Sequence, residues 1–198
     1  MFGLKFGAKK KPIEGEIVIA RLNARLQPMQ RGEHFEDPLI EVLKDLGVGE
    51  VTGGGTQLSG DGRGVDFCDI EMALSDTSEA ALQSIIAALE ELGAPKGSKL
   101  IVDASGAERP FGAAEGLALF LNGTDLPDEV YAQCDINHVI AELDRLMDGD
   151  GRLQGYWEGD RETALYCYGA SFEAMRAAIA PLLEDYPLCQ QARVEQIA

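Results

Sequence analysis

The sequence repeats itself about 100 residues further along the chain, and this feature limits its folding most. The apolar residues of the two copies match without a gap at an offset of 100: Ile17, Ile19, Leu39, Ile40, Leu43 and Leu46 fall opposite Leu117, Leu119, Val139, Ile140, Leu143 and Leu146. Cys68 meets Cys167 at an offset of 99, and segment 79–100 meets segment 173–194 at an offset of 94. An ordered series of this kind indicates two copies of one structural unit.

A segment rich in Gly, Ala and Pro separates the two copies, as is typical of a connection. The sequence therefore predicts a flexible tail over 1–12, a first unit over 13–103, a linker over 104–115 and a second unit over 116–198. An alternative interpretation makes the tail a weak membrane-surface anchor, with Phe2, Leu4 and Phe6 inserted beside the lysines at 9–11.

Each copy carries the same order of periodic segments. The expected strands are 17–22, 50–52, 65–74 and 99–102 in the first copy and 117–121, 152–155, 164–168 and 193–196 in the second. The expected helices are 38–46, 78–92, 136–147 and 172–185, with N-caps at Asp37, Ser78 and Ser171. The order β-α-β-β-α-β resembles the ferredoxin-like fold. We therefore expect an α+β protein of two tandem ferredoxin-like units, with antiparallel sheets and helices on one face.

A second resemblance concerns the glycines 53–55 and the strand Cys68-Asp-Ile-Glu that follows them. This combination is similar to uncharacterised bacterial proteins. Some small acidic bacterial proteins of similar α+β layout are immunity proteins, which bind and block a toxin. The resemblance implies a binding role, because a shared architecture by itself carries no active site.

Strand alternation assigns side chains to the two faces of each sheet. In the first copy, Cys68, Ile70, Met72 and Leu74 suit the helix side, whereas Phe67, Asp69 and Glu71 suit the open face. In the second copy, Leu165 and Cys167 point inward, and the open face carries Tyr166 and Tyr168 together with Tyr156 or Trp157. The first strand of each copy is apolar on both faces, which predicts that the open faces are covered. We expect the sister unit to provide this cover, with a groove along the seam.

The three glycines at 53–55 invite comparison with a phosphate-binding loop. Segment 55–60 has the first P-loop spacing, but Asp61 and Gly62 stand where Lys and a hydroxyl residue are needed, and a strand follows instead of a helix. A bulged or flexible β-hairpin is the better interpretation. Gly53 matches Gly155, whereas Gly54 and Gly55 are particular to the first copy and predict loop mobility or close backbone approach to a partner.

Four other combinations of residues are candidate chemical sites. His34 with neighbouring carboxylates could hold a metal, although solvated loop charge is the simpler interpretation. Asp69 and Glu71 could act in acid–base work or hold Mg²⁺, but no neighbour that raises a pKa is visible. Cys134 and His138 could share a helix face, a weak signal for nucleophilic catalysis. Segment 148–151 lacks the ligands of a calcium loop and predicts a turn.

The charge of the chain narrows its partners. The formal net charge is −17, and the first eleven residues hold four bases and no acid, so the remainder carries −21. Such a body repels nucleic-acid phosphates, which argues against nucleic-acid binding. No apolar run is long enough for a transmembrane segment. The four cysteines form no C-x-x-C pair, which predicts reduced thiols in a cytoplasmic protein and no zinc framework.

These observations favour a non-catalytic, acidic binding protein that engages a basic protein partner, as an inhibitor or immunity-type protein does. The expected binding residues are Tyr166, Tyr168, Tyr156, Trp157, Asp69, Glu71, Gly54 and Gly55. No cofactor and no metal are expected, and the chain is expected to be a monomer or a homodimer. Two alternatives remain: a regulatory protein that senses a small molecule between its units, and a metal-assisted enzyme that uses Asp69 and Glu71.

Overall fold

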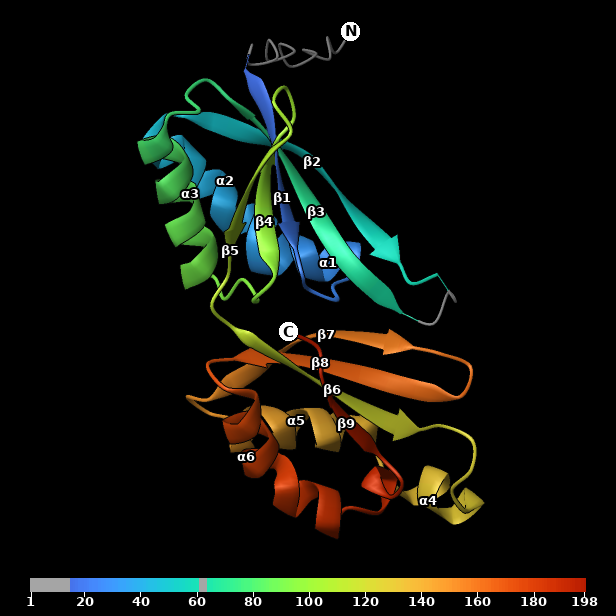
Figure 1. Ribbon diagram of the computed structural model, residues 1–198. Coiled ribbons are helices and arrows are strands. Elements are labelled where there is room, and N and C mark those ends of the chain that lie inside the picture. The colour runs from blue at the N-terminus through green and yellow to red at the C-terminus, as the bar shows by residue number, and fades with distance from the viewer. Residues whose placement is uncertain (1–14, 61–63) are drawn as a thin grey trace, which may run out of the picture.

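The computed structural model describes residues 15–60 and 64–198 and shows two sheets, each with its own helices (Figure 1). The strand order is β2-β3-β1-β4-β5 in the first sheet and β7-β8-β6-β9 in the second. In each sheet the first strand of the unit lies in the interior and pairs antiparallel with its third and fourth strands. This is the ferredoxin-like order. The protein consists of two tandem ferredoxin-like units, as the repeat predicts.

The elements of the first unit match the predicted order, with additions. Its strands are β1 (Glu16–Leu22), β2 (Gly49–Leu58), β3 (Val65–Leu74), β4 (Ser98–Val102) and β5 (Ala107–Phe111). Its helical segments are α1 (Pro28–Arg31), the π-helical turn η1 (Gly32–Glu36), α2 (Asp37–Leu46) and α3 (Glu79–Glu91). The helical period of the sequence did not predict α1 and η1, because these short segments carry no clear apolar stripe.

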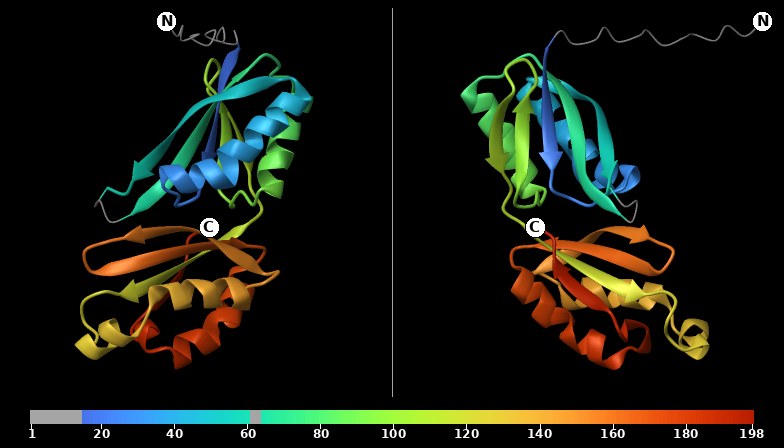
Figure 2. Two further views of the ribbon diagram at one scale, coloured as in Figure 1. Left: turned by 180° about the vertical axis from the view of Figure 1, so that it is seen from behind. Right: turned by 45° about the vertical axis from the view of Figure 1, so that its right-hand side comes forward.

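The second unit repeats the arrangement. Its strands are β6 (Glu115–Asn122), β7 (Gly151–Glu158), β8 (Glu162–Gly169) and β9 (Arg193–Gln196). Its helical segments are α4 (Asp128–Gln133), α5 (Ile136–Leu146), α6 (Phe172–Asp185) and the 3₁₀ turn η2 (Pro187–Cys189). The helices of both units lie on one face of their sheet (Figures 1 and 2). Those of the second unit lie on the side away from the first unit.

Helix starts confirm two of the three predicted caps. The Ser78 side chain accepts a hydrogen bond from the N–H of Ala81, and the Ser171 side chain accepts one from Ala174. The prediction for Asp37 was wrong. Residues 28–46 are helical without interruption, so Asp37 is already the first residue of α2 and caps nothing.

The segment 104–115 was expected as a linker, but it contains β5, which pairs antiparallel with β4 and adds a fifth strand to the first sheet. Gly106 makes the tight connection because its φ of 67° lies in the left-handed region. Pro110 is tolerated because β5 is an edge strand, where a missing N–H costs no ladder bond. The expected tail over 1–12 lies outside the described residues, and the outer unit boundaries remain a proposal.

The repeat extends to a detail of strand pairing. The pairing of β2 with β3 shifts between Val51 and Gly53, and that of β7 with β8 shifts between Leu153 and Gly155. A β-bulge therefore stands at the same place in both copies, and a matched glycine completes it. The bulged β-hairpin is confirmed, and the glycine-rich stretch lies within its first strand, because β2 continues through it to Leu58.

Candidate functional site

The open face of the second sheet is covered by the first unit. Ala118, Ala164, Tyr166 and Tyr168 belong to the same buried cluster as the core of the first unit, whereas the helix side of the second sheet has a separate core. Figure 1 shows the lower end of the first unit against this face. The expectation that the sister unit covers an open face is met for the second sheet.

This packing changes the role of two predicted binding residues. Tyr166 is 1 % exposed and Tyr168 is 2 % exposed, so neither can anchor an outside partner. Alternation assigned them to the correct face, but that face contacts the first unit. The Tyr168 hydroxyl accepts a hydrogen bond of 2.7 Å from the N–H of Arg25, and burial raises the pKa of Tyr168 far above its usual range. Both tyrosines therefore hold the two units together.

Two polar contacts and one close backbone approach complete the seam. The Gln27 side chain donates to the carbonyl of Tyr156 at 2.8 Å, and the Arg152 guanidinium donates to the carbonyl of Leu92 at 2.9 Å. Gly155 allows the close approach, since a Cβ there would lie 2.8 Å from the Arg25 carbonyl oxygen. The matched bulge glycine therefore serves the seam as well as the strand.

His34 lies at this seam and not in a solvated loop. It is part of η1, and its pKa is lowered mainly by burial and further by the positive charge of Arg152. Beside it, the side chain of Gln154 is 3 % exposed and its Oε1 has no hydrogen-bond partner among the described residues. A hollow of about 490 Å³ opens at the seam, lined among others by Gly93, Gln154 and Tyr168. The glycines 53–55 do not line it.

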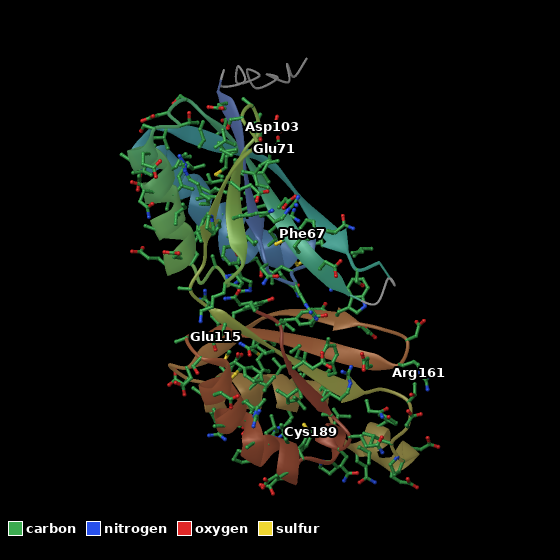
Figure 3. The ribbon with its side chains drawn as sticks, viewed as in Figure 1. Phe67, Glu71, Asp103, Glu115, Arg161 and Cys189 are labelled. Carbon is green, nitrogen blue, oxygen red and sulfur yellow. The ribbon has the colours of Figure 1, made fainter. Side chains whose placement is uncertain are left out.

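The open face of the first sheet has no helix or sister unit over it in the described part of the chain (Figures 1 and 2). We call it the first-sheet face. The strand register places these side chains on it: Ile17, Ile19, Arg21, Phe67, Asp69, Glu71, Lys99 and Ile101. All of them are half-buried except Glu71, which is exposed. Figure 3 shows Phe67 and Glu71 on this side of the sheet.

The charged residues of the first-sheet face are organised around two ion pairs. Arg21 donates two hydrogen bonds of 2.9 Å to Asp69 and lies 4.2 Å from the centre of the Phe67 ring. Lys99 pairs with Glu108 at 2.8 Å. Glu71 accepts a hydrogen bond from the Thr52 hydroxyl. Asp69 and Glu71 share one face as predicted, but both oxygens of Asp69 are bound by Arg21, which does not suit an acid–base pair.

The glycine stretch has two structural roles. Gly53 and Gly55 lie opposite Glu71 and Asp69 on the first-sheet face, and a Cβ at either would meet nothing within 4 Å. Gly54 points to the helix side. There a Cβ would lie 2.6 Å from Oε1 of Glu36, 2.7 Å from the Asp69 carbonyl oxygen and 2.9 Å from Nε of Arg31. Gly54 thus makes room for an Arg31–Glu36 pair and does not contact a partner.

We expect Gly54→Ala to lower the free energy of unfolding by about 1–3 kcal/mol, because the added methyl overpacks a site bounded by backbone. Gly53→Ala and Gly55→Ala are the matched controls. They meet open space, and alanine in a strand is favoured over glycine by about 0.5–1 kcal/mol, so both should be neutral or stabilising. Urea unfolding of the three variants checks this. Equal effects at all three positions would contradict the assignment.

The remaining chemical candidates do not assemble into a site. Cys134 ends α4 and His138 lies in α5, where its ring centre is 4.6 Å from that of Tyr186. Burial raises the pKa of Cys68 and Cys167 to about 12, so both thiols stay protonated. Within residues 15–60 and 64–198, no three or more His, Cys, Asp or Glu side chains are grouped to hold a metal ion. None of the helices in these ranges is long and apolar enough to cross a membrane.

The last two predicted binding residues lie on opposite faces of β7. Trp157 pairs across the strands with Ala164 on the open face, whereas Tyr156 pairs with Leu165 on the helix side and is 47 % exposed. Trp157 lines a hollow of about 760 Å³ at the far end of the second sheet. Sequence reasoning did not find this hollow, because its loops bring together segments that are distant in the chain.

No family model and no curated protein matches the chain. Among solved structures, it is similar to an unknown protein from Galdieria sulphuraria at 10% identity, with 91% of this chain and 96% of that chain covered and a TM-score of 0.29. It is also similar to the regulatory subunit of aspartate kinase from Thermus flavus at 15% identity, with 84% and 92% covered and a TM-score of 0.28. Similarities at this level carry no argument about function.

Proposed function

We propose that the protein is a non-catalytic binding protein that engages a basic protein partner through the first-sheet face. The observation that carries this proposal is an asymmetry between two related units. The second sheet uses its open face to hold the first unit, whereas the first sheet leaves its own open face uncovered in the described part of the chain.

The composition of the first-sheet face supports a protein partner. Ile17, Ile19 and Ile101 are neighbours across β1 and β4, and Phe67 lies further along β3, beyond the Arg21–Asp69 pair. Half-buried apolar side chains that are surrounded by charged ones are typical of interaction surfaces. Gly53 and Gly55 leave two positions of the adjoining edge strand without a side chain, so a partner can approach the carboxylates beside them closely.

The charge of this face favours a basic partner. Its two cations, Arg21 and Lys99, are already neutralised by Asp69 and Glu108, whereas Glu71 has no cation partner in the described part of the chain. The whole chain carries a formal charge of −17. Complementary charge steers association and selects against partners of the same sign.

The test places a photo-crosslinking amino acid at position 67 of the full chain and, as a control, at position 184 on the exposed surface of α6. We expect a basic protein to be captured from a lysate of the source organism at position 67 only. Purified with the chain, this partner should bind Glu71→Lys at least about tenfold more weakly, which corresponds to 1.4 kcal/mol. The matched reversal Glu184→Lys should change the affinity less than about twofold.

Three outcomes would count against the proposal. They are the same capture at both positions, a partner of acidic charge, and an affinity that Glu71→Lys leaves unchanged.

A further inference from the structure

A hollow separate from the first-sheet face is present at the far end of the second unit. The hollow of about 760 Å³ lies where β6, β7, β8 and β9 approach their connecting loops. Its size falls in the range of small-molecule sites. It continues the open face that carries Tyr166 and Tyr168, but its lining in the described part of the chain comes from the second unit alone. Its loops therefore leave it open where the first unit no longer covers the sheet.

The floor and walls of the hollow form a slot with aromatic sides. The register places Trp157, Ala164, Phe120 and Arg193 side by side across the four strands. Ala164 is small and buried, and it stands between the two aromatic residues. Since neighbouring strands are about 4.8 Å apart, the two aromatic residues start about 10 Å apart on the sheet.

An internal contact shows which chemistry the slot accepts. The Arg193 guanidinium lies 4.4 Å from the centre of the Phe120 ring and donates to both oxygens of Glu162, at 3.0 and 3.1 Å. A cation over an aromatic face, held by a carboxylate, is a favourable arrangement. Arg193 comes from β9 and reaches over Phe120 to Glu162 on β8. The other aromatic wall of the hollow is Trp157, which is paired with Ala164.

The rim of the hollow carries an excess of negative charge. Its lining holds four carboxylates and two guanidinium groups. Glu162 is paired with Arg193, but Asp125, Glu158 and Asp160 have no cation partner among the described residues. The second guanidinium, Arg161, lies at the outer tip of the β7–β8 hairpin (Figure 3). Aromatic walls below free carboxylates select a cation and disfavour an anion.

Hydrogen bonds hold this rim in place. The Asn122 side chain accepts from the N–H groups of Thr124 and Asp125 and donates to Gln191 at 3.0 Å. Gln191 has a φ of 61°, which is rare for a residue other than glycine. The N–H of Gly123 donates to the carbonyl of Arg161, which connects the β6 end to the hairpin. A rim fixed in this way reduces the entropy lost on binding.

We propose that this slot binds an alkylguanidinium cation, with the flat group against Trp157 and its charge facing Glu158 and Asp160. The cation is supplied either as a free small molecule or as the side chain of an arginine in a peptide. This site is independent of the first-sheet face and does not require the proposed protein partner.

The test uses the fluorescence of Trp157, which is the only tryptophan in the chain. The full protein is titrated with agmatine, with a neutral alkylurea of the same shape, and with the peptide Gly-Arg-Gly. We expect a saturable change with a Kd of about 1 mM or tighter for agmatine or the peptide, and none for the urea. If agmatine binds more strongly, the ligand of the slot is a free small cation. If the peptide binds more strongly, the ligand is an arginine side chain.

Two surface variants keep the result interpretable. The double variant Glu158→Gln and Asp160→Asn should weaken binding about tenfold, because it removes two of the three free rim charges and leaves the slot intact. Glu184→Gln, which removes the same kind of charge from α6, should leave the affinity unchanged. Circular dichroism confirms that each variant is folded. The proposal is overturned if neither cation gives a saturable change, if the urea binds equally, or if the double variant binds as the wild type does.

Discussion

Replacing Tyr168 by alanine is expected to lower the free energy of unfolding by about 3–5 kcal/mol, as truncation of a large buried aromatic does. Tyr168 is buried between the sheets, and its hydroxyl accepts the hydrogen bond of the Arg25 N–H from the first unit. The variant loses both the packing and this acceptor. Urea unfolding, followed by tryptophan fluorescence for the second unit and circular dichroism for the whole chain, measures the loss.

Two controls separate the contributions. Tyr168→Phe keeps the ring but leaves the Arg25 N–H without its acceptor, so we expect a smaller loss of about 1–3 kcal/mol. Tyr156→Ala changes an exposed aromatic of the same sheet and should alter stability by less than about 0.5 kcal/mol. If Tyr168→Ala were as mild as Tyr156→Ala, the two units would not depend on this contact.

The seam also shows how far strand alternation reaches. The period of two assigned Tyr166 and Tyr168 to the open face, and the pairings confirm this. It left Tyr156 or Trp157 as the third residue, and the pairing places Trp157 there. The same pattern did not predict how exposed these side chains are, because their exposure depends on which surface packs against the face. First strands that are apolar on both faces predicted covered sheets in both units. This was correct for the second sheet, but Ile17 and Ile19 of the first remain half-exposed. Strand alternation is a local property of the sequence, whereas the burial of a sheet face depends on the tertiary structure.

The glycine stretch illustrates a second limit. The repeat predicted that Gly53 and Gly155 serve the fold, and both stand at the matched bulges. It could not separate Gly54 from Gly55, because their roles depend on what lies across from each. Gly54 faces Arg31 and Glu36, which come from short helical segments that carry no periodic signal. Gly55 faces outward on the first-sheet face, and close approach to a partner there stays a prediction.

The pair behind Gly54 is expected to be the most sensitive charged contact in the first unit. The side chain of Arg31 is 8 % exposed and that of Glu36 is 22 % exposed, and Nε of Arg31 donates to Oε1 of Glu36 at 2.5 Å. A second donor of Arg31 bonds to the Thr56 hydroxyl at 2.8 Å. Glu36→Ala should lower the free energy of unfolding by about 3 kcal/mol, since it leaves a buried guanidinium without its counter-charge.

A double replacement tests whether the unpaired charge causes this loss. Arg31→Met combined with Glu36→Leu removes both charges and keeps apolar volume beside Gly54, so its stability should exceed that of Glu36→Ala by about 2 kcal/mol or more. Glu41→Ala, which breaks the exposed pair with Lys44 on α2, is the matched control and should cost less than about 1 kcal/mol. A double variant as unstable as Glu36→Ala would show that specific hydrogen bonds around Arg31, and not the burial of an unpaired charge, stabilise this corner of the first unit.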